Sequence, residues 1–388
     1  RKAFIVCTKR LTNWHRLLNR FLLTQQCVQL RTDPGAYVYR SPLQSGGGVD
    51  PSRSHDCTSP ATDSVFSIIA VYVDDILICS TSPEWISEFK TTLGNQFDIK
   101  DLGPCKWLLG MTIERNLTDN TLTIHQASYI RELLQRFGMT DCKPAATPTS
   151  ANDPRESPLL DDTTSTLYRS VVGALLYASV ATRPDITETV NRLCRFMSKP
   201  TVAHMEDAKT CLRYLQRTTT RGITFGGEEL KLHGFSDANY PTTYPSGCRA
   251  TSGYVFFLCG GAVSACSRLQ PLVTLSTAEA EYQALSLAVQ ESMFLRQMLS
   301  ELGYPQHDAT PIGEDNQACI FIATTASTSS RTKHLDIRLH FVRDAHQGGL
   351  VKIYYVPSTE MLADIFTKPI PNPQFEKIVS TVMRCSVD

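Results

Sequence analysis

The pattern of apolar and polar positions predicts short strands and amphipathic helices along most of the chain. Five apolar residues in Thr12–Leu23 recur at helical spacing, behind Thr12 as an N-cap. Further on, "VFSIIAVYV" and "ILICS" read as two strands that flank Asp74 and Asp75. Because Asp is accepted in two-residue hairpin turns, we expect both aspartates at a hairpin tip.

The middle of the chain is predicted to be helical around a linker. A helix over Pro83–Gln96 precedes a second hairpin at Thr118–Asn120 and a helix over Ala127–Phe137. Lys143–Pro158 holds four prolines and almost no periodicity, which indicates a linker. Three helical patterns follow: "TLYRSVVGALLYASVAT", "DITETVNRLCRFM" and "AHMEDAKTCLRYLQR".

The last part of the chain mixes strands and helices. Strands are predicted at "LKLHGFSD", "SGYVFFLC", "GAVSAC" and "PLVTL", followed by a long helix over Thr277–Leu302. A strand, a short helix, the strand "LVKIYYVP" and a final short helix complete an α/β unit of about 140 residues, an ordinary domain size. The fold class is therefore α/β and α+β, in several domains.

Composition narrows the class of protein. With 42% hydrophobic and 20% charged residues among 388, the chain is globular and not disordered. The 38 basic and 38 acidic residues balance, so net charge does not indicate a nucleic-acid partner. The 13 cysteines form no CxxC pair, which favours reduced thiols over zinc or disulfides. No apolar run is long enough for a membrane span. The first ten residues, "RKAFIVCTKR", lack a Met and a signal-peptide pattern, so we expect a truncation point at the start of the sequence.

Glu281 is the strongest single candidate for chemistry. On the predicted helix, steps of three and four from Glu281 reach Ala284, Leu285 and Ala288, whereas the same steps from Glu279 reach polar residues. Glu281 should therefore point at the protein and Glu279 at water, where Ser276 and Glu279 fit a capping box. A buried carboxylate needs a cation or donor partner.

Three more acids lie at the ends of predicted elements. Asp237 follows a strand, Asp315 lies between a strand and a helix, and Asp364 is on the last short helix. Each alone has an ordinary structural interpretation, as a turn residue, an N-cap and a solvated helix acid.

The last part of the chain resembles the RNase H domain of Ty1/copia-type retrotransposon polyproteins. The motifs "FSDANY", "TSGYVFFL", "LSTAEAEYQALSLAVQE", "EDNQACI", "RTKHLDIRLHFVRD" and "YVPSTEMLADIFTKP" occur in the family's order. The resemblance implies an RNase H-like α/β domain with a mixed sheet, and a two-metal site at Asp237, Glu281, Asp315 and Asp364. It implies Mg²⁺, with Mn²⁺ as a substitute, and cleavage of RNA in an RNA–DNA hybrid. Close carboxylates without metal should raise the pKa of at least one of them.

The basic run Arg331–His346 has two interpretations. It is either a solvated helix face or a segment in which some of Arg331, Lys333, Arg338 and Arg343 contact nucleic-acid phosphates. Two departures from the family pattern concern packing and substrate contacts: "VSACSRLQ" lacks the usual Trp, and "TASTSSRTKH" lacks the usual histidine before "RTKH".

The first hairpin resembles the palm motif of a reverse transcriptase. "YVDDILI" implies that Asp74 and Asp75 bind the Mg²⁺ used for nucleotide addition. "NWHRLLNRFLL" resembles the segment before that motif, and the helical patterns resemble the thumb-to-connection region. The third metal-binding aspartate and the fingers of such an enzyme are expected upstream, so we expect no polymerisation by this chain alone.

These observations give a domain scheme and three functional hypotheses. We expect partial reverse transcriptase at 1–145 (palm remnant and thumb, with a Gly/Pro/Ser-rich insertion at 41–64), linker and helical connection at 146–228, RNase H-like domain at 229–375 and a tail at 376–388. The first hypothesis is an Mg²⁺-dependent RNase H; the others are an inactive relic or co-opted nucleic-acid-binding protein, and a polymerase assembled with upstream Pol segments. The family implies no membrane partner and localisation in cytoplasmic virus-like particles with a nuclear phase.

Overall fold

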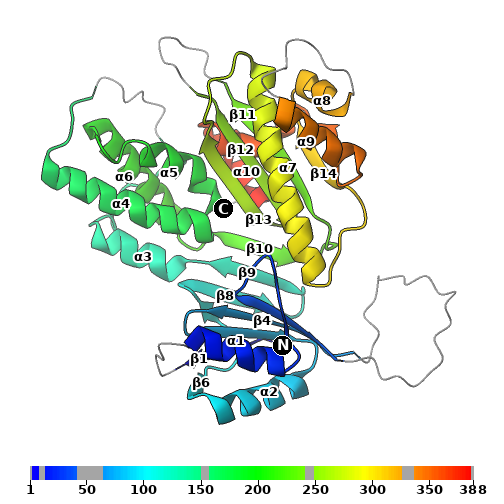
Figure 1. The fold of residues 1–388 in the computed structure, drawn as a ribbon. Coiled ribbons are helices and arrows are strands. Elements are labelled where there is room, and N and C mark those ends of the chain that lie inside the picture. The colour runs from blue at the N-terminus through cyan, green and yellow to red at the C-terminus, as the bar shows by residue number, and fades with distance from the viewer. Residues whose placement is uncertain are drawn as a thin grey trace. The chain divides into compact units, whose positions relative to one another are not determined.

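The computed structural model describes residues 2–7, 14–41, 64–149, 157–240, 249–325 and 336–385, and it divides into two compact units. Unit 1 comprises Arg1–Lys106 and Arg296–Pro305; unit 2 comprises Trp107–Leu295 and Gln306–Asp388. Figure 1 shows the elements of both.

Unit 1 is built on an antiparallel six-stranded sheet in the order β2-β3-β4-β5-β1-β6. Its strands are β1 (Lys2–Cys7), β2 (Val28–Gln29), β3 (Ala36–Arg40), β4 (Phe66–Tyr72), β5 (Asp75–Ser80) and β6 (Ile99–Asp101). Helices α1 (Trp14–Thr24) and α2 (Pro83–Gln96) bury apolar stripes in one core with Ile69, Ile76 and Ile78 of the sheet. The helices and the β4–β5 hairpin confirm the elements predicted from periodicity; the Thr12 cap lies outside the described residues.

Unit 2 begins with a four-stranded antiparallel sheet in the order β10-β9-β8-β7. Its strands are β7 (Trp107–Leu108), β8 (Met111–Asn116), β9 (Thr121–His125) and β10 (Gly222–Gly226). The helices between β9 and β10 are α3 (Ala127–Arg136), α4 (Asp162–Ala181), η2 (Pro184–Ile186), α5 (Thr187–Cys194) and α6 (Val202–Arg217). The second hairpin and all three expected helical patterns are therefore confirmed.

The rest of unit 2 is a mixed five-stranded sheet in the order β13-β12-β11-β14-β15. Strands β11 (His233–Asn239), β12 (Thr251–Leu258) and β13 (Gly261–Leu269) are antiparallel, whereas β14 (Thr310–Glu314) runs parallel to both β11 and β15 (Val351–Tyr355). The connections carry α7 (Thr277–Glu301), α8 (Gln317–Thr324) and α9 (Asp336–Gln347), and η4 (Ser358–Glu360) and η5 (Leu362–Phe366) follow β15. This mixed sheet with helical crossovers confirms the expected RNase H-like α/β class.

Helices cover the mixed sheet from two directions. In Figure 1, α7 crosses the face of the sheet nearer the viewer, and Ala280 and Ala284 of α7 pack on Ala238 of β11. Helix α10 (Asn372–Met383) packs Phe375 and Val379 in the core that includes Val255 of β12. Both helices therefore bury apolar surface against this sheet.

Two expectations differ from the structure. "PLVTL" is not a strand: β13 ends at Leu269, the Gln270 amide closes the ladder on Ala250, and Pro271 has no N–H to continue it. Residues 376–388, expected as a tail, contain most of α10, whose Ile378, Val379 and Val382 are buried.

Candidate metal centre

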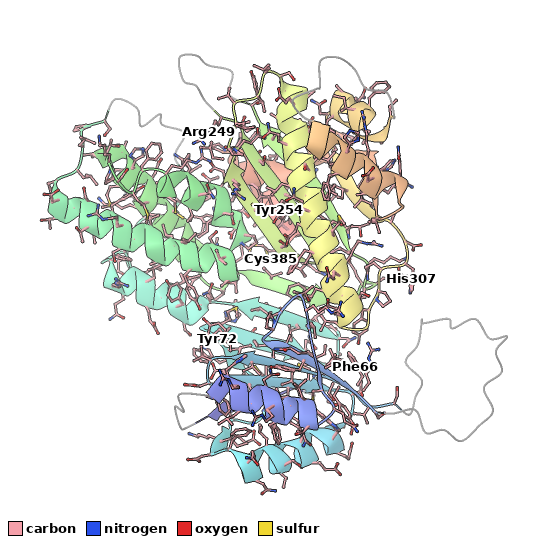
Figure 2. All side chains as sticks on the ribbon, viewed as in Figure 1. Phe66, Tyr72, Arg249, Tyr254, His307 and Cys385 are labelled. Carbon is pink, nitrogen blue, oxygen red and sulfur yellow. The ribbon has the colours of Figure 1, made fainter. Side chains whose placement is uncertain are left out.

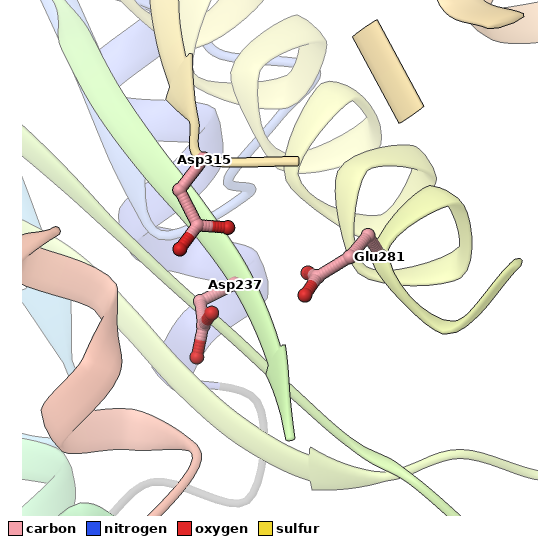
Figure 3. A group of neighbouring side chains, drawn as sticks. All are labelled: Asp237, Glu281 and Asp315. Atoms are coloured by element: carbon pink, nitrogen blue, oxygen red, sulfur yellow. The ribbon is translucent and has the colours of Figure 1, made fainter. Parts of the chain in front are cut away.

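Three carboxylates from three elements meet at one end of the mixed sheet. Asp237 comes from β11, Glu281 from α7, and Asp315 follows β14. One oxygen atom from each carboxylate lies within 4.8 Å of the other two, and Figure 3 shows the side chains converging. Asp237 and Glu281 are buried, whereas Asp315 is partly exposed, so the group has one side open to solvent.

Asp237 is held by close packing between β11, β12 and η5. It pairs with Gly253 of β12, and a Cβ on Gly253 would lie 2.6 Å from the Thr367 side chain and 2.8 Å from that of Phe366. The missing side chain therefore lets the end of η5 approach the sheet. There the Thr367 hydroxyl donates a hydrogen bond to Asp237 Oδ2.

Glu281 is positioned by the start of α7. The Glu279 amide donates to Ser276 Oγ at 3.2 Å, and the Glu279 carboxylate accepts the Leu275 amide at 2.8 Å. Glu279 thus serves the helix cap, and Glu281 is buried with only 4% of its surface exposed, as the helix-face argument predicted. The polar stripe expected to face water differs, because Gln283 and Ser286 are also buried.

The fourth predicted acid, Asp364 of η5, lies beside Asp237 but outside the group of three. Its carboxylate forms an ion pair with Lys368 Nζ at 2.7 Å. Asp315 is held separately, because Ser358 Oγ donates to Asp315 Oδ2 at 2.6 Å. The segment after β15 thus supplies one acid, Asp364, and two hydrogen-bond donors, Ser358 and Thr367, to the cluster.

The cluster has strongly perturbed electrostatics. Burial, followed by the charges of Glu314, Asp237 and Asp315, raises the pKa of Glu281 to about 11. Burial and the Asp364 charge raise the pKa of Asp237 to about 6, although Lys368 opposes this. Burial also raises the pKa of Asp364. Burial is the largest cause in each case, and neighbouring carboxylates add to it in the direction expected of crowded acids.

Glu314, Thr367 and Lys368 were missed by sequence reasoning. Glu314 ends β14, is fully buried, and has a pKa well above the ordinary value because of burial and the Asp237 charge. Lys368 is the cation of the cluster, since Asp237, Asp364 and Asp315 all raise its pKa against the effect of burial. "EDN" and "FTKP" contain these residues, but only the tertiary fold brings the two segments together.

The donor set fits a hard divalent cation. All three convergent side chains offer carboxylate oxygens, the ligands that Mg²⁺ prefers. Glu281 Oε2 and Glu314 Oε2 are buried and have no hydrogen-bond partner among the described residues. Because a buried acceptor without a donor is costly, these atoms favour a bound cation or proton.

The β4–β5 hairpin places Asp74 and Asp75 at its tip, as predicted. The two-residue turn is Val73-Asp74, and Asp75 pairs with Tyr72 as the first residue of β5. Burial and the Asp74 charge raise the pKa of Asp75. On its other side β5 pairs with β1, where Val6 is the partner of Asp75 and the segment Lys2–Cys7 has no acid. Within the described ranges, no third metal-ligating side chain joins this pair.

The four residues predicted to contact phosphates have different positions relative to the described structure. Arg331 and Lys333 lie outside the described residues, and Arg338 is on α9. The expectation for Arg343 is wrong, because its side chain is buried and its Nε donates to the Ile322 carbonyl at 3.0 Å. A guanidinium held inside the fold in this way does not face a phosphate.

The cysteines with described side chains are free thiols. Across the described ranges, every helix is too short or too polar to span a bilayer.

Comparisons with known proteins identify relatives of this chain. The family model described as reverse transcriptase (RNA-dependent DNA polymerase) matches residues 61–151. The Pol polyprotein of transposon TNT 1-94 from Nicotiana tabacum is 33% identical over 370 residues, 94% of this chain and 26% of that protein. A transposon Ty5-1 protein of Saccharomyces cerevisiae is 33% identical over 228 residues, 58% of this chain and 73% of that protein.

Among solved structures, an RNase H1 isolated from compost is similar at 15% identity with a TM-score of 0.29, covering 39% of this chain and 99% of that one. The chain spans about a quarter of the length of the Pol polyproteins that it matches. With relatives of the copia type aligned over nearly all of its residues, the chain belongs to the Ty1/copia-type retrotransposon Pol polyprotein family.

Proposed function

We propose that unit 2 carries a Mg²⁺-dependent RNase H that hydrolyses the RNA strand of an RNA–DNA hybrid. The observation that carries the proposal is the convergence of the Asp237, Glu281 and Asp315 carboxylates within 4.8 Å. These carboxylates are buried and are not balanced by an equal number of positive side chains. Such a cluster destabilises the fold, and replacing its acids would be expected to stabilise it. Its presence therefore supports a functional role in cation binding. Family membership supports the choice of nucleic acid as substrate.

Each residue has a distinct part in this proposal. Asp237, Glu281 and Asp364 would hold cations from the buried side, while Asp315 would do so beside the solvent-exposed edge. Divalent cations at such a site supply positive charge that stabilises the attacking and leaving oxygens of an in-line phosphodiester displacement. Thr367 orients the Asp237 carboxylate by its hydrogen bond, and Ser358 orients that of Asp315.

Asp74 and Asp75 would bind Mg²⁺ only in a palm that supplies a further carboxylate. The register of β1, with Val6 opposite Asp75, favours a chain that does not polymerise by itself. We place the protein in cytoplasmic virus-like particles with a nuclear phase, with nucleic acid and upstream Pol segments as its partners. We also propose a partial reverse transcriptase at 1–145, a linker and helical connection at 146–228, and an RNase H-like domain from residue 229 onward that includes α10.

A second candidate is a relic or co-opted protein that binds nucleic acid without catalysis. The pair Asp74 and Asp75, which lacks a third described ligand, favours this candidate for the polymerase half only. The acid cluster in unit 2 argues against it for the other half.

The test is cleavage of an RNA–DNA hybrid labelled on either strand, by the full chain in Mg²⁺. We expect RNA-strand cleavage that EDTA abolishes. Asp237→Asn should lower the rate by at least about 100-fold, because even residues that only support metal ligands contribute 10–100-fold. Absence of cleavage by folded wild-type protein would favour the second candidate.

A further inference from the structure

We propose that Arg195 and Arg249 bind the phosphate backbone of the nucleic acid that reaches the carboxylate cluster. The inference rests on the proposed function and adds a binding surface to it. The phosphate-binding role predicted for Arg343, which is buried, is assigned instead to two exposed arginines from different segments of unit 2.

Arg195 is fixed beside the sheet although its side chain is exposed. It is the C-cap residue of α5, and its Nη2 donates to Thr251 Oγ1 at 3.2 Å. Helix α5 itself is tied to the same end of the sheet, since Asn191 Nδ2 donates to the Ser267 carbonyl of β13. The guanidinium is therefore held in place with donors left for a ligand.

The strand register places this contact near the carboxylates. Thr251 pairs with Asn239 of β11, and Gly253 pairs with Asp237. Asn239 and Asp237 are two residues apart, about 7 Å along a strand. Arg249 lies two residues before Thr251, where β12 begins, as Figure 2 shows. Both arginines thus border the end of the β11–β12 pair at which Asp237 lies.

Among the described residues, the two arginines lack the ion-pair partners that a neighbouring arginine has. Their neighbour Arg192 is neutralised by ion pairs to Asp207 at 2.9 Å and to Glu188 at 3.5 Å. Within the described part of the chain, neither Arg195 nor Arg249 has an acid within 4 Å. The positive charges of Arg192 and Arg249 act against that of Arg195, while Glu188 attracts it. A phosphate would offset the repulsion among the arginines, and the guanidinium fork suits it.

The test measures binding of a fluorescent RNA–DNA hybrid by anisotropy, with Ca²⁺ in place of Mg²⁺ and a series of salt concentrations. The full chain is compared with the double variant Arg195→Ala/Arg249→Ala. A matched control is Arg131→Ala/Arg217→Ala, which removes two exposed arginines from α3 and α6. The variant Arg195→Lys/Arg249→Lys keeps both charges and therefore separates the effect of charge from that of side-chain packing.

Loss of two phosphate contacts should lower the slope of log K against log salt by about 1.4–1.8 and weaken binding about tenfold at low salt. The control and the lysine variant should retain the wild-type slope. If the alanine variant folds and keeps that slope, the inference is overturned while the proposed function stands. If the wild type binds hybrid in the expected way but cleaves nothing, the proposed function fails while the phosphate site stands.

Discussion

Glu281 has a carboxyl group in an acidic environment that the folded chain does not neutralise. Among the described residues its Oε2 atom has no hydrogen-bond partner, and the charges of Glu314, Asp237 and Asp315 all disfavour its ionised form. With a pKa of about 11, Glu281 is protonated near neutral pH unless a cation displaces the proton. Metal binding and proton release are therefore coupled at this residue.

We predict that binding of Mg²⁺ or Mn²⁺ near neutral pH releases at least about one proton. Isothermal titration calorimetry in buffers of different ionisation enthalpy measures this number directly. Glu281→Gln, which has no proton to lose, should release fewer protons. A binding heat that does not change with the buffer would contradict the assignment of Glu281 as a ligand.

The raised pKa of Asp237 predicts that the stability of the metal-free protein depends on pH. Its folded pKa of about 6 lies above the ordinary value of 3.8, so the folded state binds this proton more tightly than the unfolded state. The resulting stabilisation is complete below the unfolded pKa and is lost as pH rises through the folded pKa. In EDTA, the free energy of unfolding of wild type relative to Asp237→Asn should therefore fall between about pH 4 and pH 7. A constant difference in denaturant titrations across this range would argue against the shifted pKa.

For single residues, the sequence predicted burial correctly where the apolar face of one helix decides it. The choice of Glu281 over Glu279 needed only the spacing of apolar residues and a capping signal. Glu314 and Lys368 could not be chosen in this way, because their roles come from contact with the ends of β11 and η5. Arg343 was misjudged because a basic residue on a helix reads as solvated unless its contact with Ile322 is known.

At the element scale, a buried ionic network joins η2 to α6. Arg183 and Asp185 are fully buried and form an ion pair at 2.7 Å. Arg183 also donates to the Thr218 carbonyl at 2.9 Å, and Tyr214 donates to Asp185 at 2.6 Å. Because every charged group here has several partners, the network is satisfied without solvent.

Replacing Arg183 with Met should destabilise the chain by about 3–5 kcal/mol, since it leaves Asp185 as an unpaired buried charge. Chemical denaturation followed by circular dichroism measures the loss. Arg131→Met on the exposed face of α3 serves as the control and should change stability by less than about 0.5 kcal/mol. Equal effects of the two substitutions would show that the network does not stabilise unit 2.

Elements were predictable where periodicity was long and the ends carried clear signals. The helix expected near Pro83–Gln96 is α2, which Ser82 caps and whose first turn suits Pro83. "PLVTL" failed because β-branched residues suggest a strand even where no neighbouring strand is available. The segment of α10 has Phe375, Ile378, Val379 and Val382 at helical spacing, a signal present in the sequence but assigned to a tail.

At the scale of the whole molecule, the two units differ in how complete their acidic sites are. Unit 2 gathers three carboxylates within 4.8 Å, with a fourth nearby. The described part of unit 1 presents Asp74 and Asp75, and the strand paired with Asp75 contributes Val6. The family motif led us to expect a third aspartate upstream, whereas the pairing of β1 with β5 could not be predicted from the sequence.

We therefore predict no detectable primer extension by the isolated chain in Mg²⁺ with a primed RNA template and all four nucleotides. Two carboxylates on a hairpin are not expected to position both metal ions and the primer end. A parallel reaction with RNA–DNA hybrid shows whether the same preparation is active. Extension products that disappear with Asp75→Asn would refute the prediction.

The central claim is that Glu281, and not its neighbour Glu279, belongs to a working hydrolytic site. The most direct measurement is the rate of hybrid cleavage by wild type, Glu281→Gln and Glu279→Gln in Mg²⁺. We predict that Glu281→Gln lowers the rate at least about 100-fold and that Glu279→Gln, a change at the helix cap, leaves it within about threefold. Equal rates for all three proteins would contradict the claim, as would a loss caused by Glu279→Gln alone.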